Sequence, residues 1–244
     1  YEMLRRELEP ERYDRQRHRI DTCVAWSGDA AFLDWYLADH PQPVSAAATM
    51  IGTPWLHHEP EVVDRLVARL PAGDARYRSV LAVAVEFAVM HRRARRLSVL
   101  LDHGAPTQRS PGFPSAAWYA ARLGEVELLE RLAAAGADLD AAPDPGRGFP
   151  ATTPLQMTAT DDLTPRLHEA ALAFLAPRTN RLDALDPRTG ETILAAAIRA
   201  RSRPAVDALL AAGADPLVRH TSGRTAFTLA ERLWPDIVEQ LARH

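Results

Sequence analysis

The segment WLHHEPE at 55–61 holds the residues best suited to bind a metal ion. His57 and His58 stand next to each other and are followed by Glu59. Histidines that bind one metal ion from a helix stand three or four positions apart, as in H-E-x-x-H, whereas neighbouring helical positions point about 100° apart. Pro60 favours a loop or the start of a helix. We therefore expect a polar loop here, and a metal-dependent hydrolase that uses His57 and His58 is the alternative.

Other residues that could act as nucleophiles or bind phosphate are few. Cys23 is the only cysteine, so neither an intramolecular disulfide nor a cysteine zinc cluster can form. Its neighbours Val24 and Trp26 predict a buried, inert thiol rather than a nucleophile. The sequence contains neither a glycine-rich phosphate loop nor a G-x-S-x-G nucleophile elbow. We expect no enzyme activity, no cofactor and no metal.

The densest basic cluster is HRRARR at 91–96. Such a cluster can bind nucleic acid or an acidic partner. The formal net charge of the chain is −3, which opposes a duplex-binding surface because phosphate contacts need positive charge. All 29 basic residues are arginine, a bias typical of a GC-rich, bacterial genome. We expect 91–96 to be a solvated turn, and binding of nucleic acid or an acidic partner through it is the alternative.

The elements that carry these residues are predicted to be helices. Much of the apolar content is alanine and leucine, which favours helix over sheet. The stretch SVLAVAVEFAVM at 79–90 is the one that resembles a buried strand, and its length and alanines favour a helix. No apolar run approaches the ~20 residues of a membrane span, and the charged segment 1–19 lacks the apolar core of a signal peptide. We expect a soluble, cytoplasmic protein.

Several short phrases recur along the chain at nearly constant spacing. Gly190 and Gly223 are 33 positions apart, as are Thr192 and Thr225. A hydroxyl residue precedes an apolar run in four places, where a helix needs an N-cap: Ser115, Thr153, Thr192 and Thr225. Glycine follows a second apolar run, where helices end in a left-handed residue: Gly136 and Gly213. The pattern predicts repeated pairs of helices.

This pattern resembles the ankyrin repeat, a helix-turn-helix unit of about 33 residues that begins Thr-Pro-Leu-His. The resemblance implies an all-α solenoid of about six to seven helix pairs, with a helical arm and cap pair at 1–40 and the solenoid at 41–244. The regular units are 75–106, 111–141, 149–185, 186–216 and 219–244, preceded by irregular pairs at 17–40 and 41–74. The histidine of the family motif is replaced in successive units by Trp118, Gln156, Ala195 and Thr228.

The resemblance implies that a concave face, built from loop tips and first helices, binds a partner protein. A bacterial immunity protein or antitoxin, or a regulatory protein, is one version of this hypothesis, and we expect a monomer. Family positions on this face fall on Arg76, Arg78, Glu86, Phe113, Trp118, Arg122, Phe149, Arg188, Glu191, Arg199, Arg224 and Arg232. Trp118 either packs between units or anchors the interface. Phe113 and Phe149 are either binding hot spots or packing residues of their loops.

Overall fold

The computed structural model describes residues 60–68, 70, 75–109, 112–159 and 167–244, together with residues 31 and 34. Eleven α-helices and three 3-10 helices make up their regular structure. An isolated bridge joins Ala159 and Leu167, and the described part of the chain contains no β-strand. The predicted all-α class is therefore confirmed. None of the helices described is long and apolar enough to cross a membrane.

The chain divides into two compact units. Unit 1 comprises Tyr1–Ala88 and Arg93–Pro106, and unit 2 comprises Val89–Arg92 and Thr107–His244. The domain boundary expected between residues 40 and 41 lies outside the described residues, so it stays a prediction.

Unit 1 contains three described helices, with the last turn of the middle one extending beyond it: α5 (Pro60–Ala68), α6 (Ala75–Met90) and α7 (Ala94–Asp102). The single long helix α6 confirms that 79–90 is helical. Helix α5 packs against α7. Val62 and Leu66 on α5, and Leu97 and Leu100 on α7, are buried, at the three- and four-residue spacings of an amphipathic helix.

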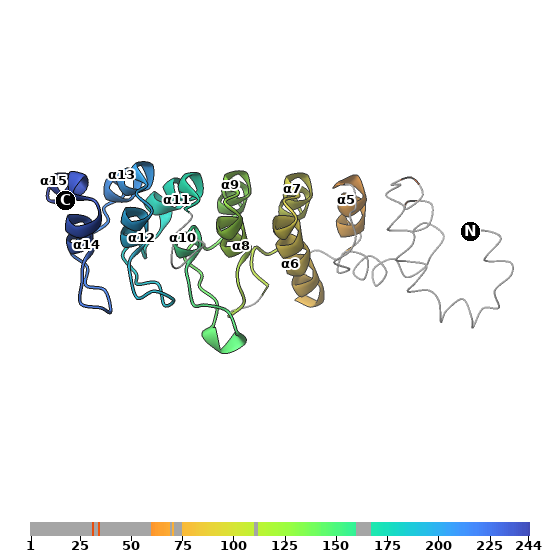
Figure 1. Ribbon diagram of the computed structural model, residues 1–244. Helices are drawn as coiled ribbons and strands as arrows, with labels where there is room; N and C mark the ends of the chain where they lie inside the picture. Colours follow the sequence, from red (N-terminus) through yellow and green to blue (C-terminus); the bar gives the residue numbers. More distant parts are fainter. Residues whose placement is uncertain are drawn as a thin grey trace, which may run out of the picture. The chain divides into compact units, whose positions relative to one another are not determined.

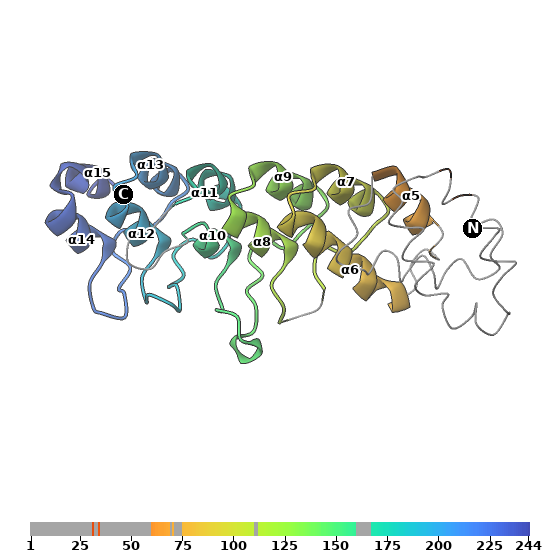
Figure 2. The same ribbon diagram turned by 45° about the vertical axis from the view of Figure 1, so that its right-hand side comes forward.

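Unit 2 consists of short helices in two rows (Figures 1 and 2). The first row contains α8 (Ala116–Leu123), α10 (Pro154–Met157), α12 (Ile193–Arg199) and α14 (Ala226–Leu233). The second contains α9 (Val126–Ala134), α11 (Glu169–Leu175), α13 (Arg203–Ala211) and α15 (Val238–Leu241). The two helices of each pair pack against each other, and four pairs of row neighbours also pack together: α8 with α10, α12 with α14, α9 with α11, and α11 with α13.

Long loops precede the first-row helices and extend to the same side of unit 2 (Figures 1 and 2). We call these loops hairpins. The hairpin before α10 carries the 3-10 helix η1 (Pro145–Arg147), which reaches farthest, and two further 3-10 helices, η2 (Ala176–Arg178) and η3 (Pro235–Ile237), lie in the second row.

Side-chain caps start all four first-row helices, as the sequence predicts. Each hydroxyl accepts a hydrogen bond from the backbone N–H three residues later, and the four residues are Ser115, Thr153, Thr192 and Thr225. Such a cap stabilises a helix by about 1 kcal/mol. These caps place the hairpin at one end of every first-row helix and thereby position the candidate surface.

Left-handed residues follow four helices of unit 2, namely α8, α9, α12 and α13. Gly136 and Gly213 have φ values of 78° and 93°, which confirms their predicted role. Between paired helices, Gly124 is left-handed with φ 72°, but Arg201 takes the corresponding turn with φ 51°. A left-handed backbone is unfavourable for residues other than glycine. Arg201 has a compensating contact, because its Nη2 donates to the Leu233 carbonyl at 2.6 Å.

Leucines, valines and small residues form the core of unit 2. The second-row side chains Leu128, Leu129 and Leu132 on α9, and Val206, Leu209 and Leu210 on α13, are buried. First-row alanines are buried at Ala120, Ala121, Ala195 and Ala197. Small side chains let adjacent first-row helices approach closely, and longer apolar side chains of this row, such as Leu155, Leu194 and Leu229, are buried as well.

Candidate binding surface

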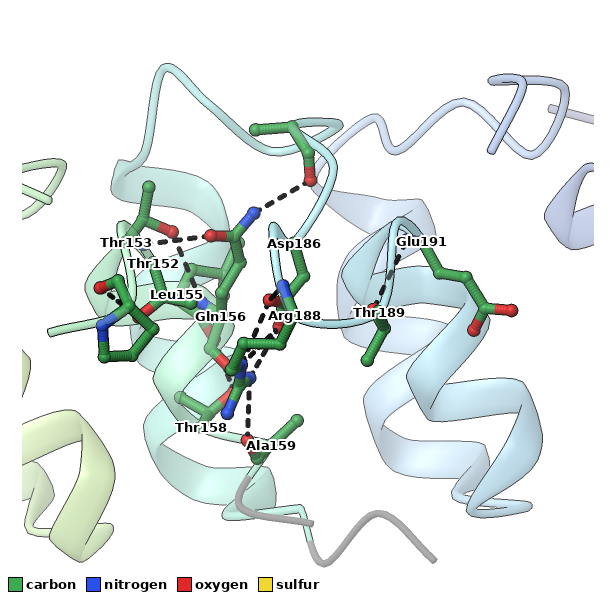
Figure 3. Close-up of polar contacts among 12 residues, drawn as sticks. Thr152, Thr153, Leu155, Gln156, Thr158, Ala159, Asp186, Arg188, Thr189 and Glu191 are labelled. Carbon is green, nitrogen blue, oxygen red and sulfur yellow. Dashed lines mark hydrogen bonds and ion pairs between the residues drawn. The ribbon is translucent and has the colours of Figure 1, made fainter. Parts of the chain in front are cut away.

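The hairpin before α12 contains a buried ion pair (Figure 3). Asp186 accepts hydrogen bonds from the backbone N–H of Arg188 at 2.8 Å and from its Nε and Nη2 at 3.0 and 2.5 Å. The side chain of Asp186 is 10% exposed and that of Arg188 is 19% exposed. Because both carboxylate oxygens face one guanidinium, the pair is two-pronged and holds the hairpin in one conformation.

Arg188 also reaches the preceding first-row helix. Its Nη2 donates to the carbonyls of Gln156 and Ala159, both at 3.2 Å (Figure 3). Gln156 lies in the last turn of α10 and Ala159 two residues beyond its end, where positive charge is favoured. Arg188 therefore joins the α12 hairpin to α10.

The amide of Gln156 completes this contact from the α10 side. Its Oε1 accepts from the Thr153 N–H at 2.9 Å, and its Nε2 donates to the Ala184 carbonyl at 3.0 Å. The first bond closes a capping box, and the second crosses to the next hairpin (Figure 3). We call Gln156, Asp186 and Arg188, with their carbonyl partners, the charged junction.

The next junction along the row uses neutral groups. His220 is buried, and its Nε2 lies 3.4 Å from the hydroxyl of Thr192. The Thr221 N–H donates to the Gly190 carbonyl at 3.0 Å. Burial lowers the pKa of His220 because desolvation disfavours the imidazolium; Glu191 raises this pKa and Arg199 lowers it. We call Gly190, Thr192, His220 and Thr221 the neutral junction.

A pocket lies between α10 and α12 beside these junctions. Gln156, Arg188, Glu191 and Arg199 are among its lining residues. The open space measures about 20 Å³, which is room for one water molecule and far less than the several hundred Å³ of a small-molecule site. The pocket is therefore a notch in a larger surface.

Three proposed site residues lie largely inside the protein. Trp118 is 3% exposed, and its indole N–H donates to the hydroxyl of Thr152 at 3.1 Å. Glu86 on α6 is 9% exposed, and Arg188 is engaged in the charged junction. The placement of these three on an open surface is corrected here. Trp118 packs between two successive repeats of unit 2, because its indole N–H bonds to Thr152 in the hairpin of the next repeat.

The two hairpin phenylalanines have different surroundings. Phe149 meets Trp118 edge to face, with ring centroids 6.5 Å apart, so it is a packing residue. The guanidinium carbon of Arg109 lies 4.9 Å from the Phe113 ring centroid, and that of Arg147 lies 4.3 Å from it. We call Arg109, Phe113 and Arg147 the tip cluster. Sequence reasoning missed its two arginines. Arg147 stands 34 positions after Phe113 and meets it only because two hairpins come together, and Arg109 stands four positions before Phe113 in a loop, where no helical register sets its direction.

Arginines on the first row remain exposed. Arg122, Arg199 and Arg232 each stand seven residues after an N-cap, on α8, α12 and α14, and Arg224 is exposed in the last hairpin. The guanidinium of Arg122 lies 5.9 Å from the Trp118 ring centroid, and Arg199 is paired with Glu191. These residues form the face of the first row.

The remaining candidates fall into three groups. His57, His58 and Cys23, and the side chain of Arg76, lie outside the described residues. Arg78 is exposed on α6. In the basic cluster, 91–93 form the turn before α7 and 94–96 begin that helix, and Arg92 pairs with Glu125 at 2.9 Å. Within the described ranges, no group of three His, Cys, Asp or Glu could hold a metal ion.

No known family model matches this chain, and no curated protein matches it either.

Proposed function

We propose that this protein is a non-catalytic binding module, an ankyrin-like solenoid that holds a partner protein against its first-row helices and hairpins. The expected helix pairs, caps and left-handed glycines support the architecture, since they recur at equivalent positions in successive repeats. Function does not follow from a fold alone, so the choice of surface must come from the residues that the fold leaves exposed.

The observation that carries the proposal is the contrast between neighbouring positions of the first-row helices. The alanines that face the core are small and buried, whereas the position seven residues after the cap is an exposed arginine on α8, α12 and α14. Arginine is enriched in the energetically important parts of protein interfaces. A face lined by repeated arginines, beside a notch too small for a ligand, fits another macromolecule.

Affinity purification from lysate of the source organism tests the proposal. The face variant R122E/R232E reverses two exposed charges and leaves Arg199 in its pair with Glu191. The control variant R203E/R243E makes the same net-charge change at two exposed residues of the second-row side, Arg203 at the start of α13 and Arg243 just after α15. Arg203 forms an exposed pair with Asp207, and such a pair contributes little to stability. We expect mass spectrometry to find a protein enriched by the wild type and the control but depleted by the face variant.

Two results would contradict the proposal. One is equal recovery of every enriched protein by the face variant and the wild type. The other is the absence of any protein enriched over the tag alone. Circular dichroism and thermal melting of both variants establish that charge reversal has not unfolded the chain.

A further inference from the structure

The tip cluster lies on the hairpin side of unit 2, and its two exposed arginines both contact one phenylalanine ring. Its residues come from two hairpins of unit 2, since Arg109 and Phe113 precede α8 and Arg147 ends η1. The hairpins are joined by a hydrogen bond from the Asp144 N–H to the Gly112 carbonyl at 2.9 Å. The cluster is therefore built on a tied pair of hairpins rather than on one isolated loop.

Both arginines of the cluster are exposed, and one ring holds both guanidinium groups. Stacking on an aromatic ring is a known mode of arginine, and it leaves the N–H groups at the edge of the guanidinium free to bind a carboxylate with two hydrogen bonds. Among the described residues, neither Arg109 nor Arg147 forms an ion pair. The ring thus lowers the freedom of two cations without neutralising them.

Asp144 is an acidic residue in the same hairpin as Arg147. Its Oδ1 accepts a hydrogen bond from the Gly146 N–H at 2.9 Å, and its Cβ lies close enough that a methyl group on Gly112 would approach it to 3.1 Å. The carboxylate thus shapes the turn that presents Arg147. Two guanidiniums and one carboxylate leave the cluster with a net positive charge.

We propose that the tip cluster binds carboxylates of an acidic segment in the partner protein. This inference rests on the proposed function and specifies the chemistry of the partner. Charge complementarity supports an acidic polypeptide: exposed arginines also occur along the first row at Arg122 and Arg232, whereas on the second row exposed acids such as Glu127, Glu130 and Asp207 accompany exposed arginines such as Arg203. A polypeptide is favoured over nucleic acid because the net charge of the chain is −3, which disfavours an extended polyanion.

The test uses the full chain and two labelled probes, poly-L-glutamate and an oligo-dT strand of equal charge, with fluorescence anisotropy as the readout. We expect saturable binding of poly-L-glutamate. Its dissociation constant should rise about tenfold or more in R109E/R147E, since two charge-assisted contacts are lost. The second-row control R203E/R243E should change it by about twofold at most.

Further variants separate charge, stacking and folding. R109Q/R147Q removes both charges without adding negative ones and should lose binding in the same direction. F113L keeps both arginines but removes the ring, and we expect an intermediate loss, about threefold, because the guanidiniums are no longer held in place. An unchanged dissociation constant for F113L would overturn the role of the ring.

Three outcomes would overturn the proposed ligand: no saturable binding of poly-L-glutamate, an equal loss in the second-row control, or tighter binding of oligo-dT that R109E/R147E abolishes. The last would make the cluster a nucleic-acid site. The lysate experiment separates this inference from the proposed function. A partner that R109E/R147E keeps and R122E/R232E loses would refute the tip cluster as its binding site and leave the first-row face intact.

Discussion

The charged and neutral junctions connect equivalent elements of unit 2 with different chemistry. In the first, Arg188 and Gln156 join the α12 hairpin to α10 through an ion pair, an amide and three backbone carbonyls. In the second, a buried imidazole faces a hydroxyl, and two hairpins meet at Gly190 and Thr221. The same helix-pair geometry thus tolerates a charged or a neutral connection, provided that each buried polar group has a partner.

The charged junction should be the more costly one to break. R188M leaves the largely buried carboxylate of Asp186 without its cation, and we expect the free energy of unfolding to fall by about 3 kcal/mol. Urea denaturation followed by circular dichroism measures the loss. The double variant D186N/R188M removes both charges and should lose less than R188M alone; an equal or larger loss in the double variant would show that the unpaired charge is not the cause.

The neutral junction should depend on backbone shape rather than on charge. In G190A the added Cβ would overlap Thr221 Oγ1 and lie 2.9 Å from its Cβ, at a φ of 69° that alanine disfavours. We expect a loss of about 2 kcal/mol in unfolding free energy. G213A is the matched control, since its φ is 93° but nothing lies within 4 Å of the added Cβ. If both variants lose the same amount, close approach to Thr221 contributes nothing.

The caps beside the two junctions allow a finer comparison. Thr153 and Thr192 both cap first-row helices, but of these two caps only that of Thr153 is reciprocal, because the Thr153 N–H donates to Gln156 Oε1. We expect T153A and T192A each to cost about 1 kcal/mol. In a Q156L background, the cost of T153A should change, because the two residues share the capping box. Strict additivity in urea melts of this double-mutant cycle would argue against coupling.

The smallest expected effect is a pH dependence confined to the neutral junction. Since burial lowers the pKa of His220 in the folded protein, the unfolded chain binds the proton more readily. Stability is therefore full above the ordinary histidine pKa of about 6.5 and decreases as the pH falls below it. Thermal melting from neutral to mildly acidic pH should show a smaller decrease in H220Q than in wild type. A decrease of the same size in H220Q would assign the acid sensitivity to other groups.

The local parts of the fold were predictable from sequence. Caps such as Thr192 and left-handed glycines such as Gly213 follow from the backbone chemistry of a few adjacent residues. The reach of Arg188 to α10 and the stacking of Arg147 on Phe113 connect residues about thirty positions apart. They depend on how hairpins meet, and arginine has no fixed partner in sequence. The left-handed Arg201 was missed because its local preference is overridden by packing and by its bond to Leu233.

The first-row arginines were chosen from the family resemblance, and in the structure they share one register, seven residues after a cap. Burial of Trp118 was one of two readings left open, since the sequence does not show whether a hydroxyl will stand opposite an indole. Thr152 supplies that hydroxyl. The exposure of a candidate residue is thus most predictable where its position in the repeat determines it, and least predictable where contacts with the neighbouring repeat determine it.

The side chain of Arg188 has a consequence for how such a chain can change length. Arg188 belongs to the copy at 186–216, but its Nη2 donates to the Gln156 and Ala159 carbonyls of the copy before it. Deleting the unit at 186–216 would remove Asp186 and Arg188 together, and these two carbonyls would lose their guanidinium donor even where the remaining helices are compatible. The chemistry of this junction therefore depends on the order of the copies.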